Sequence, residues 1–453
     1  MKILIVGAGE VGFRIATHLA HENKDVVVID NDPEAIRRVA ERVDVQVITG
    51  SGSNPVLLEE AGIKQADILL AVTNHDETNL VACLMASLLA PTIKKLARVR
   101  DAGFDGFHDS FRDFPPNIDT IISPEIEVVK TIEQLMSVPG AVDINEFANG
   151  RVKFVGIHLD EETGLTDIPL SELSKVNKDK PLIAAIVRDE KLIIPRGGDQ
   201  LKKDDLIYFI SEDNNLSKTL AFFKKQEEPI KRALIVGGGR VGSRLAESLE
   251  KKSIHTKIVE KNAEQCKRLA ENLDKAIVLH GDGSDHAFLN EVNAGNMDII
   301  ITLTGDEETN ILTSLLAKRM GVKKIITKIN KFSYFPLMAA IGLKQLISPR
   351  LSAINSILRH IRRGKVISAV SIIGDQAEVM EAVALETSDI VGKPLDRLSI
   401  PKGVLITGII RDDQVIIPRG DSVIEPGDKI IIFAMRQAIP KIEKILSVKL
   451  EFF

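Results

Sequence analysis

Cysteine is scarce in this 453-residue chain, which contains only Cys83 and Cys266. They lie in different halves, each within a helical pattern, so the sequence indicates neither a disulfide framework nor a cysteine metal cluster. Reduced thiols fit a cytoplasmic protein. His280, His286 and His360 show no metal-ligand spacing with other histidine, cysteine or acidic residues, so we expect no metal site.

Long apolar runs and sorting signals are also missing. The longest candidate run, Leu80–Ala90, contains Ser87 and is shorter than the roughly 18 to 20 apolar residues that a spanning helix needs. The first residues lead into a strand and a glycine turn without a basic region, a long apolar region or a cleavage site. We expect a protein that neither crosses a membrane nor is exported.

An excess of charge of either sign is lacking as well. Lys and Arg number 59 against 64 Asp and Glu, for a net charge of −5, so nothing draws the whole chain onto a phosphate backbone. Nucleic acid is not an expected partner. The length and the 44% of hydrophobic residues exceed what one core uses, which predicts several domains.

The chain does contain a repeat. The segment Ile3–Gly12 recurs 230 positions later as Ala233–Gly242, and the similarity continues downstream. A second kind of segment occurs as Ile186–Gly197 and Ile409–Gly420, where two strand-like runs flank an acidic turn and end in Pro-Arg-Gly. This pattern predicts a β-hairpin. The order is therefore A-B-A′-B′, with a polar linker between the halves. We expect the domain ranges to be 1–137, 138–223, 224–230 (the linker), 231–364 and 365–453.

Each A segment alternates apolar runs of strand length with longer amphipathic stretches. In the first copy the expected strands are Ile3–Gly7, Val26–Asp30, Val45–Thr49 and Ile68–Thr73, with helices starting at Val11, Pro33, Pro55 and Glu77. Such alternation builds a parallel sheet covered by helices on both faces. The predicted fold class is α/β, with two tandem Rossmann-like doubly wound parallel-sheet domains, each followed by a small α+β lobe. Ligands bind such sheets at the carboxyl ends of the strands.

A G-x-G-x-x-G motif joins the first strand to the first helix in both copies. The first glycine allows a tight turn, the second lets the backbone approach a pyrophosphate, and the third lets the helix pack on the sheet. Phosphate would lie at the helix N-terminus, where unpaired N–H groups favour negative charge. The two loops are Gly7-Ala8-Gly9-Glu10-Val11-Gly12 and Gly237-Gly238-Gly239-Arg240-Val241-Gly242.

An acidic residue ends the second strand of each copy, eighteen positions after the last glycine, at Asp30 and Glu260. Such a carboxylate accepts hydrogen bonds from ribose hydroxyls and repels a 2′-phosphate. The motif therefore favours NAD(H) or an adenine mononucleotide over NADP(H). The alternative is a Rossmann-like turn that binds nothing.

The two loops differ at one position, where Glu10 stands in the first copy and Arg240 in the second. A glutamate disfavours extra phosphate charge, whereas an arginine attracts it. Our hypothesis is that the first site prefers NAD(H) and the second tolerates ADP or ATP. The alternative is that both side chains point into solvent.

The tips of later strands offer further candidates. Thr73-Asn74 and Thr304-Gly305 end the fourth apolar run of each copy, and Arg98 and Lys328 follow the next strand. The threonines and the asparagine can face the ligand or simply cap a helix. The two cations can contact phosphate or a ring.

Catalytic machinery is not evident. His75 is the best candidate base, but Asp306 stands at its place in the second copy, and there is no G-x-S-x-G or Walker A pattern. We therefore expect a binding protein and no catalytic residues. An NAD-dependent oxidoreductase is the alternative, and a scaffold with vestigial pockets is a third. Arginines of the B segments could hold a second small ligand, although solvated side chains are the simpler interpretation; they are Arg188, Arg196, Arg411 and Arg419.

These motifs resemble the TrkA family of potassium-uptake regulators, which are tandems of RCK domains. The resemblance rests on the A-B-A′-B′ order, the glycine loops, and the hairpin ends, and it spans nearly the whole chain. The other residues that carry it are Asp30, Thr73-Asn74, Asp76-Glu77-Thr78-Asn79, Arg98, Ile122-Ser123-Pro124 and their second-copy partners through Ile347-Ser348-Pro349.

The resemblance implies a cytoplasmic regulatory subunit, peripheral on the cytoplasmic face of the membrane, that docks on a potassium transporter subunit of the TrkH type. It implies binding of NAD(H), ADP or ATP and a homodimer of four stacked RCK modules. By the same resemblance the first-site ligands are Gly7 to Val11, Asp30, Thr73, Asn74 and Arg98. In the second site Gly305 and Lys328 replace Asn74 and Arg98, so those contacts depart from the pattern.

Overall fold

The structure is a computed structural model that describes residues 1–160, 163–173, 181–225, 229–361, 366–372, 376–412 and 414–446. Part of the expected linker (226–228) and the expected boundary at 364 lie outside these ranges. The chain forms two compact units, Met1–Val128 with Ser348–Ile361, and Val129–Ile347 with Arg362–Phe453. Among the described residues, every helix is too short or too polar to span a bilayer.

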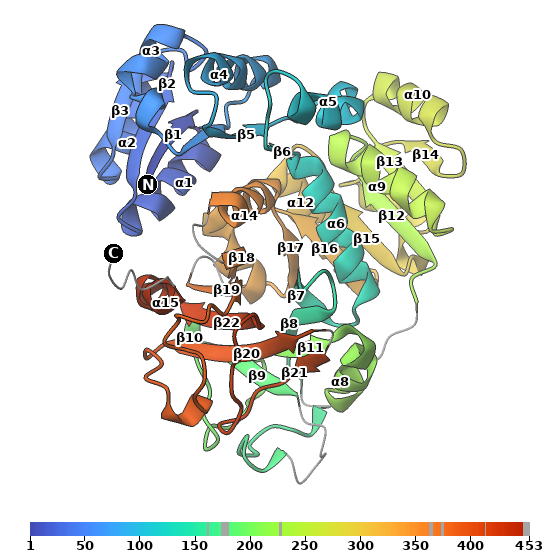
Figure 1. Cartoon of the computed structure of the whole chain (residues 1–453). Helices are drawn as coiled ribbons and strands as arrows, with labels where there is room; N and C mark the ends of the chain where they lie inside the picture. The colour runs from blue at the N-terminus through green and yellow to red at the C-terminus, as the bar shows by residue number, and fades with distance from the viewer. Residues whose placement is uncertain are drawn as a thin grey trace. The chain divides into compact units, whose positions relative to one another are not determined.

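The first unit contains a six-stranded sheet in the order β3-β2-β1-β4-β5-β6, with every pair parallel (Figure 1). The strand order reverses between β1 and β4, as in dinucleotide-binding folds. The strands are β1 (Lys2–Val6), β2 (Asp25–Asp30), β3 (Gln46–Thr49), β4 (Ile68–Ala71), β5 (Lys94–Arg98) and β6 (Thr120–Ile122). The helices between them are α1 (Glu10–His21), α2 (Pro33–Arg42), α3 (Pro55–Glu60), α4 (Asp76–Leu89) and α5 (His108–Asp113).

The expected elements of the first copy are confirmed to within a residue or two. The central strands are buried along nearly their whole length because helices cover the sheet. Asp32 and Asn54 cap α2 and α3 by accepting hydrogen bonds from the backbone, and proline follows each at the first helical position. These caps explain why the sequence places the helix starts well.

The second unit repeats this sheet in the order β14-β13-β12-β15-β16-β17. Its strands are β12 (Arg232–Val236), β13 (His255–Glu260), β14 (Ile277–His280), β15 (Ile299–Thr302), β16 (Lys324–Lys328) and β17 (Gln345–Ile347). Its helices are α9 (Arg240–Lys251), α10 (Ala263–Asn272), α11 (His286–Glu291), α12 (Glu307–Arg319) and α13 (Phe335–Ala340). The predicted tandem of Rossmann-like domains is confirmed.

The last helix of each A segment contacts the other repeat. The helix α14 (Pro349–Ile361) follows the second sheet in sequence but packs against α1 and β6 in the first unit. The helix α6 (Pro124–Ser137) follows the first sheet, and its Glu133 contacts Ser248 of α9 and Lys252, the residue directly after α9, within the second unit. Each glycine-loop helix therefore packs on a helix of the opposite repeat. The repeat pattern in the sequence did not predict this exchange.

The B segments form two antiparallel sheets of five strands, in the orders β10-β9-β11-β8-β7 and β18-β19-β22-β20-β21. The first contains β7 (Ala141–Phe147), β8 (Val152–His158), β9 (Leu182–Arg188), β10 (Lys191–Ile193) and β11 (Leu206–Glu212), followed by α8 (Leu216–Phe222). The second contains β18 (Val366–Ile372), β19 (Ala377–Val383), β20 (Val404–Arg411), β21 (Gln414–Ile416) and β22 (Lys429–Met435), followed by α15 (Ile439–Leu446).

The predicted hairpins are confirmed. Arg188 pairs with Lys191 across a two-residue turn, where Asp189 and Glu190 have φ values of 49° and 62°. Two positive φ values are the signature of a type I′ turn, whose twist matches that of the strands. In the second hairpin Asp412 has a φ of 52°, and residue 413 lies outside the described ranges.

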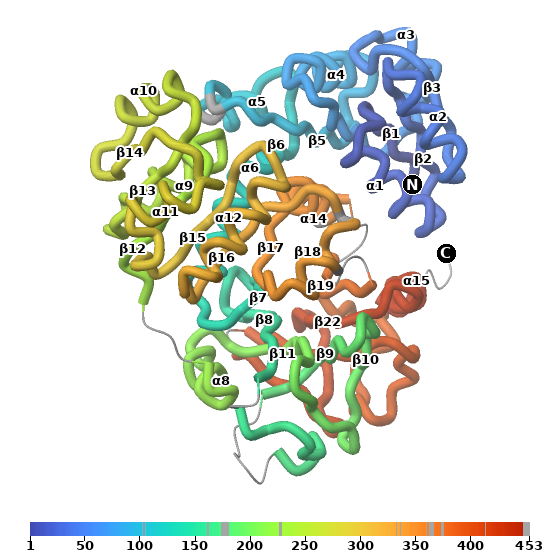
Figure 2. The backbone as a smooth tube through the Cα atoms, turned by 180° about the vertical axis from the view of Figure 1, so that it is seen from behind, coloured from blue at the N-terminus to red at the C-terminus, as the bar shows by residue number. Residues whose placement is uncertain are grey.

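The two β lobes lie side by side within the second unit (Figure 2). They share one hydrophobic core. The ring of Phe154 stacks on Tyr208 of its own lobe at 5.5 Å and on Phe433 of the other lobe at 6.2 Å between centroids. The buried Glu381 carboxylate accepts a hydrogen bond from the backbone N–H of Ala148 across the lobes. Burial of aromatic rings on this scale binds the lobes firmly to one another.

Candidate functional site

The glycine loops have the backbone that a dinucleotide cradle requires. Gly7 has a φ of +115°, and a Cβ there would lie 2.9 Å from the backbone nitrogen of Thr73. A Cβ on Gly12 would lie 1.8 Å from the carbonyl oxygen of Gly7, so only glycine fits. A Cβ on Gly9 would meet nothing within 4 Å, and no side chain caps α1 at this residue. The start of α1 is therefore open to an anion. Gly237, Gly239 and Gly242 repeat this geometry.

The two acidic residues lie beside the loops, as the motif requires. The Asp30 carboxylate accepts hydrogen bonds from the N–H of Ala8 and of Asp32, at 2.5 and 2.9 Å. Glu260 accepts from Gly238 and Asn262, both at 2.8 Å. A carboxylate has about four lone-pair directions, so both side chains keep acceptor capacity for ribose hydroxyls.

The variable loop position differs in its surroundings as well as in its charge. Glu10 forms an ion pair with Arg38 of α2 at 2.6 Å, and Arg38 also donates to the carbonyl of Ala8 and lies over the Phe13 ring. The alternative that both side chains point into solvent is therefore wrong for Glu10, whereas Arg240 is exposed, as that alternative expects. The sequence interpretation missed Arg38, although the repeat offset aligns it with Arg268.

The second loop carries two cations in place of this ion pair. Arg240 and Arg268 are exposed, and neither side chain forms a hydrogen bond or ion pair with any residue that the structure describes. Gln265 takes over the contact to the loop by donating to the carbonyl of Gly238 at 2.8 Å. The second loop is thus more electropositive than the first.

Thr73 and Thr304 form hydrogen bonds within the loops that follow β4 and β15, whereas the N-cap residues of the next helices are His75 and Asp306. The hydroxyl of Thr73 donates to Oδ1 of the buried Asn79 at 2.7 Å, and its oxygen accepts a hydrogen bond from the N–H of His75 at 3.2 Å. The amide of Asn79 donates to the carbonyls of Thr73 and Arg98, which ties β4 to β5. Asn310 makes the same set of bonds with Thr304 and Lys328. The threonine hydroxyls are thus occupied by bonds within the protein, although neither threonine is the N-cap of the next helix. The sequence interpretation did not assign Asn79 and Asn310 to the site. Asn74 and Gly305 are exposed beside them.

The two cations that follow the next strand differ. Burial and the nearby Arg100 lower the pKa of Arg98 to about 10, and its Nε is buried without a hydrogen-bond partner. Lys328 instead donates to the carbonyl of Thr304 at 2.9 Å. A buried guanidinium nitrogen without a partner is costly, so Arg98 is poised to receive an acceptor group. The two predicted nucleotide sites therefore differ at this position, since Arg98 has an unpaired nitrogen and the Lys328 ammonium has a partner.

Two of the B-segment arginines are structural. Arg188 makes two parallel bonds to the buried Asp205, at 2.8 and 2.7 Å, and Arg411 does the same with Asp428, at 3.0 and 2.9 Å. Each pair fixes the hairpin to the strand beside it. The expectation of a solvated side chain is wrong for these two residues. Arg196 and Arg419 are exposed.

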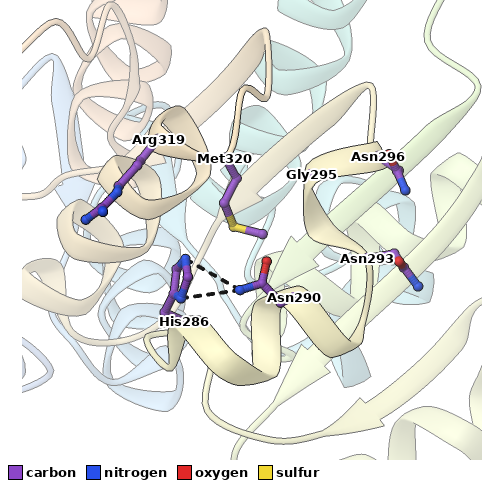
Figure 3. A pocket seen from close by; sticks show the side chains of 7 residues that line it. All are labelled: His286, Asn290, Asn293, Gly295, Asn296, Arg319 and Met320. Atoms are coloured by element: carbon purple, nitrogen blue, oxygen red, sulfur yellow. Dashed lines mark hydrogen bonds between the residues drawn. The ribbon is translucent and has the colours of Figure 1, made fainter.

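A cavity of about 350 Å³ lies elsewhere, between α11, the short helix Ala294–Asn296 and the end of α12 (Figure 3). These segments lead into the amino-terminal ends of β15 and β16, opposite the edge where a nucleotide is expected. The cavity is therefore separate from the predicted site. Its lining is His286, Asn290, Asn293, Gly295, Asn296, Arg319 and Met320.

The fold and the paired glycine loops define a class of protein, in which two Rossmann-like domains in tandem are each followed by an antiparallel β lobe. Among solved structures the chain is similar to the "GsuK channel bound to NAD", with a TM-score of 0.61 at 16% identity over 98% of this chain and 78% of that chain. It is also similar to the GsuK RCK domain, with a TM-score of 0.60 at 16% identity over 98% and 94%. This likeness concerns the fold.

The sequence comparisons identify the family. The TrkA-N domain matches residues 3–124 and 233–349, and the TrkA-C domain matches residues 155–224 and 379–447. Proteins named "Trk system potassium uptake protein TrkA" from Azorhizobium caulinodans and Halomonas elongata are each 38% identical, covering 100% of both chains. A homologue from Methanosarcina mazei is 35% identical over 98% of this chain and 99% of its own. The chain belongs to the TrkA family, which confirms the resemblance drawn from its motifs.

Proposed function

We propose that this chain is the nucleotide-sensing regulatory subunit of a Trk-type potassium transporter. In this role it docks on a membrane subunit of the TrkH type from the cytoplasmic side and controls ion flux through a change of conformation. Family membership and the potassium-uptake names of the relatives support the proposal. The observation that carries it is the pair of glycine cradles, each open at the start of a helix.

The first crevice binds NAD(H) through the backbone of Gly7 to Val11, with Asp30 on the ribose and Asn74 and Arg98 at the strand tips. GsuK, which is similar in fold, has a structure bound to NAD. The open Gly9 and the unpaired Nε of Arg98 fit this cofactor.

The second crevice binds ADP or ATP at Gly237 to Gly242, with Glu260 on the ribose. Arg240 and Arg268 leave two positive charges without partners among the described residues, and such charges favour a ligand with more phosphate. In the first crevice the Glu10 carboxylate cancels the charge of Arg38. The unequal charge supports unequal nucleotide preference.

The exchanged helices provide a path from ligand to lobe. The first loop begins α1, which packs on α14, and α14 precedes the second β lobe in sequence. The second loop begins α9, which contacts α6, and α6 precedes the first β lobe. A ligand that binds two arrangements of these helices with different affinity shifts the population between them.

Self-association is part of the proposal, as a homodimer of four stacked modules. Val81 on α4 and its second-copy counterpart Leu312 on α12 are 41% and 55% exposed, and Leu88 on α4 is 69% exposed. Large apolar side chains at matching outer positions in both repeats are suited to contact with another copy. We also propose the domain ranges 1–137, 138–223, 231–364 and 365–453, and peripheral attachment to the cytoplasmic face.

A thermal-shift panel on the full chain tests ligand binding. NAD+, NADH, ADP and ATP should each raise Tm, whereas NADPH should not, because its 2′-phosphate meets Asp30 or Glu260. The cognate membrane subunit should then co-purify with the chain in at least one nucleotide state. Absence of any shift contradicts nucleotide sensing, and absence of co-purification in every state contradicts the transport role. Oxidation of NADH by the chain with a carbonyl substrate would instead support an enzyme.

A further inference from the structure

Buried polar atoms without hydrogen-bond partners gather at one edge of the first sheet. They are Arg98 Nε at the end of β5, Ser123 Oγ just after β6, and Glu125 Oε2 at the start of α6. Ser123 and Glu125 are 6% and 9% exposed. Atoms of this kind are rarely left unpaired in a folded protein unless a ligand or water meets them.

Asp76 and Arg100 extend this group. The carboxylate of Asp76 is 8% exposed and accepts hydrogen bonds from the N–H of Arg100 and Asp101. Its second oxygen lies 3.8 Å from Nε of Arg100, an ionic contact beyond hydrogen-bond distance, and both atoms are without a hydrogen-bond partner. The group therefore offers donors and acceptors together.

At the equivalent edge of the second sheet, the corresponding polar side chains form hydrogen bonds within the protein. Lys328, in place of Arg98, donates to the Thr304 carbonyl. Ser348, in place of Ser123, accepts a bond from Leu351, and Glu307, in place of Asp76, accepts bonds from Asn330 and Lys331. In the described part of the chain, none of these three side chains has a buried unpaired atom. The unpaired edge is thus specific to the first repeat.

The second repeat also contributes to the first edge. The helix α14 packs on α1 and β6 within the first unit, and its second residue is Arg350. Arg350 follows Ser-Pro in the second copy as Glu125 does in the first. It interacts electrostatically with Arg98, whose pKa it helps to lower. A partly buried cation from the other repeat therefore lies close to the unpaired group.

The position of these unpaired polar atoms in the fold indicates which part of a bound dinucleotide would lie near them. A dinucleotide lies across the point where the strand order reverses, with its adenosine half on the β2 side and its second nucleoside on the β4 side. The unpaired group lies at the carboxyl ends of β5 and β6, on the side of the second nucleoside. A mononucleotide on the glycine loop has no group that extends in this direction.

We propose that Ser123, Glu125 and Arg350, together with Arg98, form a subsite for the second nucleoside of a dinucleotide, which the first repeat has and the second lacks. Guanidinium groups donate to the ring amide and ribose oxygens, and the Glu125 carboxylate and Ser123 hydroxyl accept from ribose hydroxyls and the amide NH2. Because Arg350 belongs to the second repeat, a dinucleotide touches both repeats and ADP only one. This subsite rests on the proposed nucleotide-binding function.

Hydrogen exchange of the full chain, read by mass spectrometry, tests the subsite with ADP, ADP-ribose and NAD+ as probes. All three should protect the amides of residues 7–12. ADP-ribose and NAD+, but not ADP, should also protect residues 74–76, 98–101 and 349–352. Identical protection by ADP and NAD+ overturns the subsite and leaves nucleotide binding intact. Absence of protection by all three overturns the proposed function itself.

Variants of the subsite residues then distinguish the contribution of the subsite to binding from that of the glycine loop. Arg350→Gln and Ser123→Ala should each weaken NAD+ binding at the first site roughly 3- to 10-fold and change ADP affinity less than about twofold, since each removes one hydrogen bond. Ser348→Ala, the second-copy counterpart of Ser123, is the matched control and should leave both affinities unchanged. Equal losses for NAD+ and ADP, or unchanged NAD+ affinity in folded variants, contradict the subsite.

Discussion

Glu10 and Arg38 form an ion pair across the mouth of the first glycine loop, with 2.6 Å between Oε1 and Nη1. At the corresponding positions of the second repeat stand two arginines, Arg240 and Arg268, whose like charges cannot pair. A single change of sign at the loop therefore frees two cations in the second repeat. We propose that the two nucleotide sites differ in ligand preference because of this difference.

Reversing one of these charges should act on the second site alone. Arg240→Glu is expected to weaken ATP binding at the second site roughly 10-fold or more, because a charge-assisted contact is lost and a repulsion is gained. Calorimetric titration of the full chain measures this change. Glu10→Gln in the first loop is the matched control and should leave the second-site affinity unchanged. An unaltered ATP affinity in Arg240→Glu would show that this side chain does not meet the phosphates.

Two glycine substitutions in the first loop should have different effects, one on nucleotide affinity and the other on stability. A methyl group at Gly9 enters open space, so Gly9→Ala should keep its Tm within about 2 °C but lose roughly 10-fold or more in nucleotide affinity at the first site. Gly12→Ala should lower Tm by several degrees, since its Cβ would overlap the Gly7 carbonyl. Melting curves with and without NAD+ check both outcomes. Wild-type NAD+ affinity in Gly9→Ala would contradict the cradle.

Asn79 should contribute strongly to stability. Its buried amide joins the backbone of Thr73 to that of Arg98, and its replacement leaves a buried N–H and two carbonyls without partners. Asn79→Ala is expected to cost about 2 to 4 kcal/mol in the free energy of unfolding. Urea denaturation of the full chain measures the loss, and Asn310→Ala should behave alike in the second repeat. A cost below about 0.5 kcal/mol in either variant contradicts the role of these asparagines.

Asp143 should make the first β lobe more stable in acid. Burial raises the pKa of this carboxyl, which accepts hydrogen bonds from Tyr208 and Asn145. Because the pKa is higher in the folded chain, this carboxyl contributes most to stability below its unfolded pKa, and the contribution is lost as pH rises through the folded value. Asp143→Asn should therefore raise Tm at pH 7 and have a smaller effect near pH 4.

Asp282 provides the control of opposite sign for that experiment. Hydrogen bonds from Lys261 and Ser284 lower the pKa of Asp282 to about 2, so its contribution is present above the unfolded pKa and is lost as pH falls toward 2. Asp282→Asn should lower Tm slightly at pH 7 and have no effect near pH 2. If Asp143→Asn shows the same pH trend as Asp282→Asn, the burial of Asp143 is not what shifts its pKa.

Local sequence signals predicted most of the fold. Caps such as Asp32 and Asn54 and the glycine turns placed the elements of both sheets, because these residues act within a few positions of their own backbone. The exchange of α6 and α14 was not predictable from such signals. It depends on packing between segments more than 100 residues apart, as between Glu133 and Ser248, which a repeat pattern does not specify.

Only part of the candidate site was predicted, because sequence signals are local and some site residues come from distant segments. The glycines and acidic residues follow a fixed spacing in the chain, so the sequence alone places them. Arg38 and Asn79 lie on other helices and are brought to the site only by folding, and the same holds for Arg350 of the proposed subsite. Arg188 and Arg411 were misinterpreted as solvated because their partners, Asp205 and Asp428, lie seventeen positions away, each directly before another strand.

We propose that the chain holds two unequal nucleotide sites, the first for NAD(H) and the second for ADP or ATP. Calorimetric titration of ATP into the full chain already saturated with NAD+ tests this proposal. A single ATP per chain should still bind, with an affinity that Arg240→Glu reduces. Loss of all ATP binding once NAD+ is present would contradict it, since both nucleotides would then occupy the same crevice.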